Sequence, residues 1–233
     1  LEALADEVIS IVAKAQQPDG YLDTYYLVAE PGRRWTDERR KHELYCAGHM
    51  MEAAVAYFDA TGKRALLEVV CRLADHIATV FGPEPGKKHG YPGHQVIEMA
   101  LVKLFHATGE ARFLDLARYF IDERGKQPHF YDIEERERGE AGHKGYFEDY
   151  VYAYTQAHRP VREQDKAVGH AVRAVYLYSG MADVAMETGD ASLAEACRPL
   201  WRHVPRRQMY VTGGIGSPGY GEDFPFAFDL PTD

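Results

Sequence analysis

Residues 93–124 decide the fold, and they read GHQVIEMALVKLFHATGEARFLDLARYFIDER. From Gln95 to Ala107 the side chains are apolar nearly all round, which is typical of a helix buried on most sides. From Glu110 to Arg124 the apolar side chains fall on one face only, as in a helix at the surface. Between the two, Gly109 suits the left-handed position that ends a helix. The stretch therefore predicts a buried helix and an amphipathic helix that returns antiparallel to it.

The same order occurs in two further stretches, residues 48–81 and 169–203. Each begins with Gly-His, continues as an apolar helix, turns at Thr-Gly and returns as a second helix. In the first of these copies we expect the apolar helix to begin at Met50, directly after Gly48-His49. Buried and amphipathic helices that alternate in antiparallel pairs predict an all-α fold with two concentric layers. Either a toroid of helix pairs or a curved helical array has this arrangement.

One more helix is expected over residues 3–15, with Leu4, Val8 and Ile11 on its apolar face. This makes about seven helices, and a closed toroid of six pairs needs twelve, so the chain is not expected to close a ring by itself. Pro199 should kink or end the last return helix, because its ring clashes with the carbonyl four residues earlier.

The repeat places three histidines in equivalent positions. If the copies are equivalent, His49, His94 and His170 stand at one end of the inner layer and the Thr-Gly turns stand at the other. Three histidines around one mouth indicate a polar pocket. The alternative is that each is a structural histidine held by its own hydrogen bonds.

A second candidate site lies in the glycine-rich stretch from Tyr210 to Asp233. Glycine lets the backbone approach a ligand closely. The carboxyl group of Glu222 stands beside Phe224, Phe226 and Phe228, and apolar surroundings raise the pKa of a carboxyl group, as a general acid requires near neutral pH. The alternative is a surface loop with a solvated glutamate.

Composition and motifs exclude several classes of function. The G-x-G-x-x-G at residues 214–219 is not expected to bind a dinucleotide, because Pro218 interrupts it and no helical pattern follows. The net charge of −9 argues against nucleic acid or an anionic membrane as a partner. No apolar run is long enough to span a membrane. Cys46, Cys71 and Cys197 are odd in number and widely spaced, which predicts buried free thiols in a reducing, cytoplasmic compartment.

Residues 125–160 interrupt the repeat with many charged and aromatic side chains. Aromatic side chains at this density predict an ordered cover near a pocket, since sugar rings and apolar ligands pack on aromatic faces. The charged run from Glu134 to Glu140 is expected to be a solvated, mobile loop.

Five motifs in order resemble glycoside hydrolase family 127, the β-L-arabinofuranosidases. They are ELYCAGH at residues 43–49, GYPGHQ at 90–95, QAHRPVREQ at 156–164, AVGHAVRA at 167–174, and TGGIGS at 212–217 followed by Gly221-Glu222. The resemblance covers nearly the whole chain. It implies an (α/α)6 barrel followed by β-sandwich domains. Because residue 1 is Leu and already lies in a helical pattern, we expect residues 1–233 to be part of one catalytic barrel domain, truncated at both ends, without the β-sandwich domains.

The resemblance also implies an activity and a site. The family removes terminal β-L-arabinofuranosides with retention, using a zinc-bound cysteine as nucleophile and a glutamate as general acid/base. Glu222 matches that glutamate, His49, His94 and His170 match sugar-contacting positions, and His158 is a further candidate for substrate binding. Asp223 and Pro225 depart from the family's small or apolar residues beside the acid.

The family's zinc ligands are a Glu-x-Cys pair and two adjacent cysteines, and none of these motifs occurs in the chain. The resemblance therefore places the zinc and the nucleophile beyond Asp233, with no metal ligand in this segment. A carbohydrate is the expected partner, and a homodimer is one alternative for the oligomeric state. A sugar epimerase on the same toroid and a non-catalytic helical-repeat binding protein are the other functions that the sequence allows.

Overall fold

The computed structural model describes residues 1–140, 148–216 and 221–231, and no β-strand occurs in these ranges. Seven helices carry the fold, and they agree in number and place with the sequence analysis. They are α1 Glu2–Ala15, α3 Glu43–Thr61, α4 Ala65–Val80, α5 Ile97–Thr108, α6 Ala111–Glu123, α9 Ala171–Thr188 and α10 Ala191–Arg207. Four short elements were not predicted. These are α2 Thr24–Val28, α7 Phe130–Glu137, α8 Glu148–Tyr154 and the 3-10 helix η1 Val161–Glu163.

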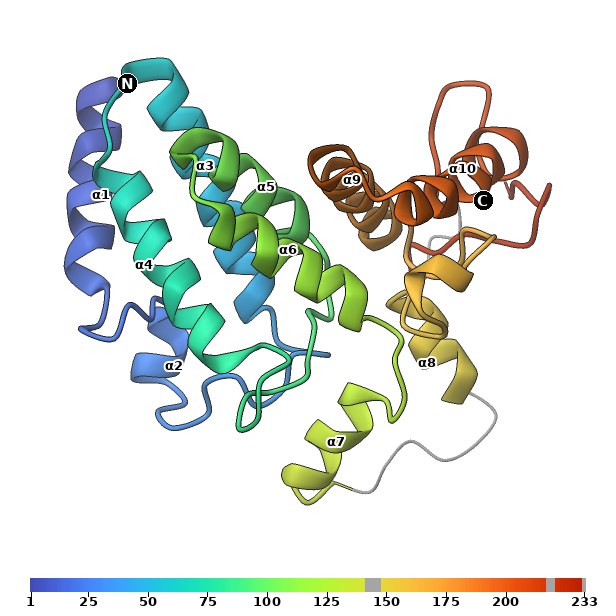
Figure 1. Ribbon diagram of the computed structural model, residues 1–233, viewed down its shortest axis with the longest axis horizontal. Coiled ribbons are helices and arrows are strands. Elements are labelled where there is room, and N and C mark those ends of the chain that lie inside the picture. The colour runs from blue at the N-terminus through green and yellow to red at the C-terminus, as the bar shows by residue number, and fades with distance from the viewer. Residues whose placement is uncertain (141–147, 217–220, 232–233) are drawn as a thin grey trace.

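The long helices form two layers of antiparallel pairs, which confirms the predicted all-α architecture. The inner helices are α3, α5 and α9, and their outer partners are α4, α6 and α10. Helix α5 contacts α3, α6 and α9, so it is buried on most sides, whereas α6 buries only one stripe. Figure 1 shows α1 and α4 on one side of α3 and α5, with α9 and α10 on the other side.

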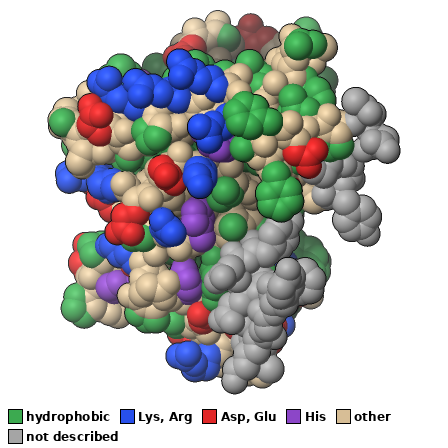
Figure 2. Space-filling view, turned by 90° about the vertical axis from the view of Figure 1, so that its right-hand side faces the viewer, with side chains coloured by type: hydrophobic (Ala, Val, Ile, Leu, Met, Phe, Trp, Pro, Cys, Tyr) green, Lys and Arg blue, Asp and Glu red, His purple; other side chains and the backbone are tan. Residues whose placement is uncertain are grey.

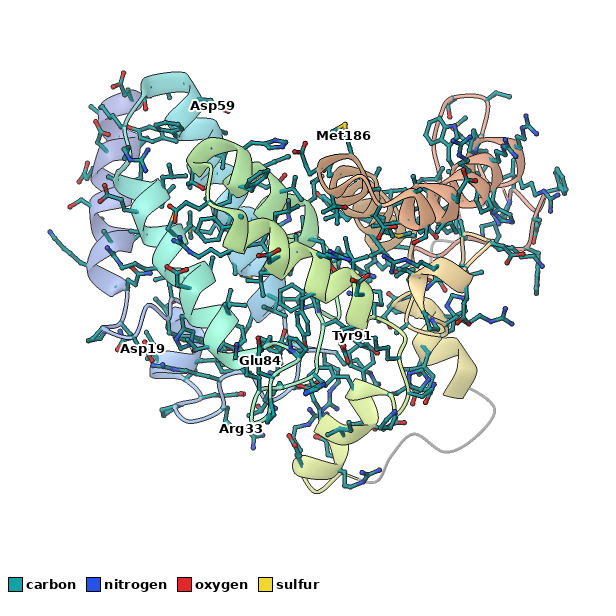
Figure 3. The ribbon with its side chains drawn as sticks, viewed as in Figure 1. Asp19, Arg33, Asp59, Glu84, Tyr91 and Met186 are labelled. Carbon is teal, nitrogen blue, oxygen red and sulfur yellow. The ribbon has the colours of Figure 1, made fainter. Side chains whose placement is uncertain are left out.

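The Thr-Gly turns end the inner helices as expected. Gly62, Gly109 and Gly189 follow α3, α5 and α9 with φ angles of 72°, 75° and 69°, the left-handed conformation in which glycine has no steric penalty. Asp59 near the end of α3 and Met186 near the end of α9 lie together at the upper side of the molecule, and Tyr91, ahead of α5, lies lower (Figure 3). The turns therefore lie at one end of the inner layer.

The predicted start of α3 is wrong, because the helix begins at Glu43 and contains Gly48-His49 in its second turn. The Glu43 carboxylate accepts hydrogen bonds from the Trp35 N–H at 2.8 Å and the Tyr21 hydroxyl at 2.6 Å, which fixes the first turn. Gly48 serves close packing instead. A Cβ there would stand 2.3 Å from Cγ1 of Val96, so the glycine lets α3 approach the start of α5.

Pro199 does not end α10, which continues through Pro199 and Pro205 to Arg207. The carbonyl that loses its partner belongs to Glu195, and this residue is exposed, so water can replace the missing N–H. The helix also buries a continuous stripe before and after the proline. This stripe consists of Leu193, Ala196, Leu200 and His203. Packing and hydration therefore offset the local cost of the ring.

Helix α1 was predicted correctly, but its apolar face is not buried. Leu4, Val8 and Ile11 are exposed, and Ile9 is the buried residue of the helix. The cysteine prediction is also wrong in part. Cys46 is exposed, and only Cys71 and Cys197 are partly buried, with all three thiols free. Among the described helices, none is both long and apolar enough to cross a membrane.

The charged run from Glu134 to Glu140 was expected to be a solvated, mobile loop, and this is wrong for residues 134–137. They form the end of α7, where the carboxylates of Glu134 and Glu135 are buried. The Glu134 carboxylate accepts the backbone N–H of Glu38 at 3.0 Å, and Glu135 pairs with Arg39. Ion pairing and hydrogen bonding to the loop before α3 hold these charges inside. Tyr146 and Phe147, part of the predicted aromatic cover, lie outside the described residues.

Candidate active site

The three repeat histidines meet at the end of the inner layer opposite the Thr-Gly turns. The rings of His94 and His170 have centroids 5.4 Å apart. The ring of Tyr45 links His49 to His94, because its centroid lies 4.5 Å from that of His49 and 4.3 Å from that of His94. Figure 2 shows histidine side chains on this side of the molecule, with Lys and Arg side chains around them. Only the juxtaposition follows from these contacts, and sugar binding stays a prediction.

The three histidines come from different local positions. His49 lies inside α3, His94 lies in the loop three residues before α5, and His170 is the N-cap of α9. The copies are therefore not equivalent in helix register. The close approach of α3 and α5 at Gly48 brings His49 beside the ends of the other two helices. Tertiary packing thus produces the cluster that the repeat pattern suggested.

Glu222 joins this cluster through His170. Its Oε2 lies 2.9 Å from Nε2 of His170. The other ring nitrogen of His170, Nδ1, accepts the backbone N–H of Arg173 at 3.4 Å, so in the neutral ring the proton is on Nε2 and points to Glu222. Burial, together with the charge of Arg173, lowers the pKa of His170 and favours this neutral form. His170 therefore donates a hydrogen bond that orients the carboxyl group.

The backbone of the glycine-rich stretch is attached to the start of α9. The Ala171 N–H donates to the Glu222 carbonyl at 2.9 Å, and the Phe224 N–H donates to the Gly169 carbonyl at 2.8 Å. Glu222 itself has a φ of 54°, a strained conformation for a residue with a side chain. These contacts place Glu222 at the histidine end although it is distant from His49 in sequence.

The aromatic residues beside Glu222 do not shield it from water. Its side chain is 75% exposed. Phe226 and Phe228 are also exposed, and only Phe224 is buried. The apolar environment that the sequence suggested is therefore not supplied by this aromatic run.

His94 has a defined tautomer as well. Its Nδ1 lies 2.9 Å from the Gln95 carbonyl oxygen, which can only accept, so Nδ1 carries the proton. Burial lowers the pKa of His94 to about 4. Near neutral pH the ring is uncharged, and Nε2 remains as a hydrogen-bond acceptor. Such an acceptor suits a sugar hydroxyl group.

His158 follows α8 and does not contact the rings of His49, His94 or His170 in the described part of the chain. Burial lowers its pKa, and its charged neighbours include Arg159. Its role in substrate binding stays a prediction.

Tyr154, part of the predicted aromatic cover, contacts the ring of His170. Four other residues of the cluster were not found from the sequence. They are His42, Tyr45, Arg173 and Tyr176. A signal was present for two of them. Tyr45 precedes His49 by four residues and Arg173 follows His170 by three, and residues three or four apart share one face of a helix.

The described residues do not form a zinc site. Within the described ranges, no three His, Cys, Asp or Glu side chains are grouped so that they could hold a metal ion. Cys46, Cys71 and Cys197 belong to three different helices, α3, α4 and α10. No chemical step through a metal is derived from these residues.

A two-layered helical fold with a histidine-paired glutamate at one end of its inner layer is consistent with a toroidal carbohydrate-active enzyme. The chain matches, over residues 1–233, the model of the β-L-arabinofuranosidase GH127 catalytic domain. It therefore belongs to this family of glycoside hydrolases.

Individual relatives agree with this assignment. The chain is 44% identical to the non-reducing end β-L-arabinofuranosidase of Bifidobacterium longum subsp. longum, over 100% of this chain and 36% of that protein. It superimposes on a solved GH127 β-L-arabinofuranosidase from Geobacillus stearothermophilus T6 with a TM-score of 0.96 and 57% identity, over 100% of this chain and 36% of that one. A second solved GH127 β-arabinofuranosidase gives a TM-score of 0.84 at 43% identity, over 99% of this chain and 34% of that one. The chain thus spans about a third of the length of these relatives.

Proposed function

We propose that the full-length protein is a retaining exo-acting glycoside hydrolase that releases L-arabinose from terminal β-L-arabinofuranosides. The observation that carries the proposal is the 2.9 Å contact between His170 Nε2 and Glu222 Oε2 at the end where three histidines meet. Membership of the GH127 family and the printed activity of the Bifidobacterium relative support the choice of sugar. The same membership favours a hydrolase over an epimerase or a binding array.

Glu222 has the central chemical role. As a carboxylic acid it gives its proton to the glycosidic oxygen as the bond to the sugar breaks. As a carboxylate it then takes a proton from the water that releases the sugar. His170 is a positioning residue, because its Nε2–H holds Oε2 and leaves Oε1 for the substrate. His94 accepts a sugar hydroxyl at Nε2.

The nucleophile of a retaining reaction is not among the described residues. The family resemblance assigns it to a zinc-bound cysteine beyond Asp233, where the zinc would lower the pKa of the thiol. The residues described here would contribute the acid/base group and part of the sugar-binding surface to that site.

The test is the replacement Glu222→Gln in the full-length enzyme, which keeps the shape of the side chain and removes its titrating proton. For an alkyl β-L-arabinofuranoside, kcat should fall about 10²–10⁴-fold. The loss should be much smaller for an aryl glycoside with a good leaving group, which needs little protonation. NMR of the first product should show retained configuration.

Glu195→Gln is the matched control, since Glu195 is an exposed glutamate on α10 that pairs with the exposed Arg198. It should hydrolyse both substrates like the wild type. Wild-type turnover of the alkyl glycoside by Glu222→Gln would overturn the acid/base assignment. An inverted product would overturn the retaining reaction.

A further inference from the structure

A cavity rich in arginine lies next to the histidine cluster, with Tyr154 belonging to both. Its volume is about 350 Å³. The loop before α3, helix α8 and the first turn of α9 enclose it. Its lining consists of Arg39, Arg40, Val151, Tyr154, Thr155 and Arg173. Such a concentration of guanidinium groups favours a ligand with acceptor oxygens.

Two of these arginines are already neutralised by the protein. Arg39 forms an ion pair with the buried Glu135. Arg40 forms ion pairs with Asp37 at 2.7 Å and Glu140 at 2.8 Å. They shape the cavity, but their charges are matched.

Arg173 differs from both, because its guanidinium forms no ion pair and no hydrogen bond with any described residue. The side chain is half-buried, and Nε is fully shielded from solvent. The guanidinium lies over the ring of Tyr154, 4.7 Å from the centroid. Stacking occupies the face of the planar group and leaves its N–H edges available. Asp223 acts on the Arg173 charge but lies outside ion-pair distance. A partly buried charge without an ion-paired carboxylate is unusual in proteins unless a ligand supplies that partner.

A series of contacts through Tyr154 and His170 connects Arg173 to the acid/base group. Glu222 lies 2.9 Å from His170, and the His170 ring lies 5.4 Å from that of Tyr154, on which Arg173 stacks. A general acid stands at the bond between the sugar and its leaving group, so both binding regions must border Glu222. The neutral His94 suits the hydroxyl groups of a sugar. L-arabinose has no carboxylate, so an anion at Arg173 must belong to the leaving group.

We propose that this cavity is a leaving-group subsite in which Arg173 binds the carboxylate of an acidic aglycone. The inference rests on the proposed glycosidase function. One unmatched guanidinium corresponds to one carboxylate, which it can bind through two parallel N–H···O hydrogen bonds. The Tyr154 ring stacks on the guanidinium, and it provides a flat apolar surface against which the rest of the aglycone can pack.

The test compares two aryl β-L-arabinofuranosides that have the same size and differ in charge, with a para-carboxyphenyl or a para-carbamoylphenyl leaving group. In the full-length enzyme, Arg173→Gln should lower kcat/KM for the carboxylated glycoside about 10- to 100-fold and change it for the amide by less than about threefold. Comparing the variant with the wild type cancels the intrinsic reactivity of the two leaving groups. Arg173→Lys keeps the charge but not the planar fork, and should recover part of the loss.

Arg198→Gln is the control, since Arg198 is an exposed arginine on α10 and should leave both rates unchanged. An equal fall for both glycosides in Arg173→Gln, or no change in either, would overturn the carboxylate subsite.

Wild-type turnover of the neutral amide tests the proposed function separately. If neither glycoside is cleaved, calorimetric binding of both to the wild type and to Arg173→Gln decides the subsite, because the charge preference should persist in the dissociation constants. If Arg173→Gln does not fold, Arg173→Met removes the same charge and takes its place in the comparison.

Discussion

Arg124 and Arg173 each lie over a tyrosine ring, and only for Arg124 do the described residues also supply hydrogen-bond acceptors. Arg124 stacks over Tyr91 at 4.8 Å and pairs with Glu98 at 3.2 Å, with both charged side chains 0% exposed. It also donates to the carbonyls of Pro92 and Thr155, each at 2.8 Å. Figure 3 places Tyr91 within this packed region.

Arg173 stacks over Tyr154 at 4.7 Å in nearly the same way, but no described carboxylate or carbonyl receives its N–H groups. The Nε atom of each arginine lacks a hydrogen-bond partner, so the difference lies in the terminal nitrogens. The same side-chain pair is structural where the fold supplies acceptors. It is available for a ligand where the fold does not.

The largest effect on stability is expected from Arg124→Met. This change leaves Glu98 buried without its cation. It also removes one of the two hydrogen bonds that the Pro92 and Thr155 carbonyls each accept. The free energy of unfolding should fall by about 3–5 kcal/mol. Denaturant unfolding of the full-length protein measures this loss.

Arg118→Met is the matched control, since Arg118 is a half-exposed arginine on the same helical hairpin, and it should cost no more than about 0.5 kcal/mol. Combining Arg124→Met with Glu98→Met should cost less than the sum of the single changes, because no buried charge is then left unpaired. Strict additivity would contradict the pairing.

A smaller effect extends the comparison to a buried negative charge. Burial raises the pKa of Glu134 to about 7. The folded state then binds a proton that the unfolded state has lost, so stability should decrease as the pH rises from about 4.5 to about 7. We expect Glu134→Gln to reduce this decrease by about 1–3 kcal/mol. Unfolding measured across this pH range tests the prediction.

The slope should not vanish in Glu134→Gln, because burial also raises the pKa of Glu38 and Glu43. Replacing the exposed Glu137 on the same helix by Gln is the control and should leave the pH profile as it is in the wild type. A profile in Glu134→Gln that is as steep as that of the wild type would contradict the assignment of the shift to Glu134.

The smallest effect is expected from Arg173→Met. The guanidinium makes no hydrogen bond to a described residue, and a desolvated charge is removed, so the free energy of unfolding should change by less than about 1 kcal/mol. The same denaturant experiment measures it beside Arg124→Met. A loss as large as that of Arg124→Met would mean that Arg173 is structural, and the contrast between the two regions would fail.

The sequence analysis predicted the helical hairpins well and the irregular segments poorly. The hairpins follow from local rules, namely the spacing of apolar side chains and the glycines at the helix ends. The burial of Glu134 was missed, because its partner Glu38 lies 96 residues away and no local pattern reports such a contact. The start of α3 was missed because Gly48 reads as a helix start, although its role is contact with Val96.

The candidate site was predicted in its residue types more than in its environment. The repeat pointed to His49, His94 and His170, and the structure brings them together. The aromatic neighbours of Glu222 suggested an apolar pocket, yet Phe226 is exposed. Neighbours in sequence need not be neighbours in space outside regular elements, so that expectation had little physical basis.

By itself, the sequence determined that the chain forms alternating buried and amphipathic helices, where these helices end, and which family it belongs to. These properties depend on side chains a few residues apart, within one or two helical turns. The tertiary structure alone decided that His170 contacts Glu222 and that Arg124 is paired whereas Arg173 is not. Pairing of charges depends on which distant segments pack together, and the energy of a buried charge depends on whether that packing supplies a partner.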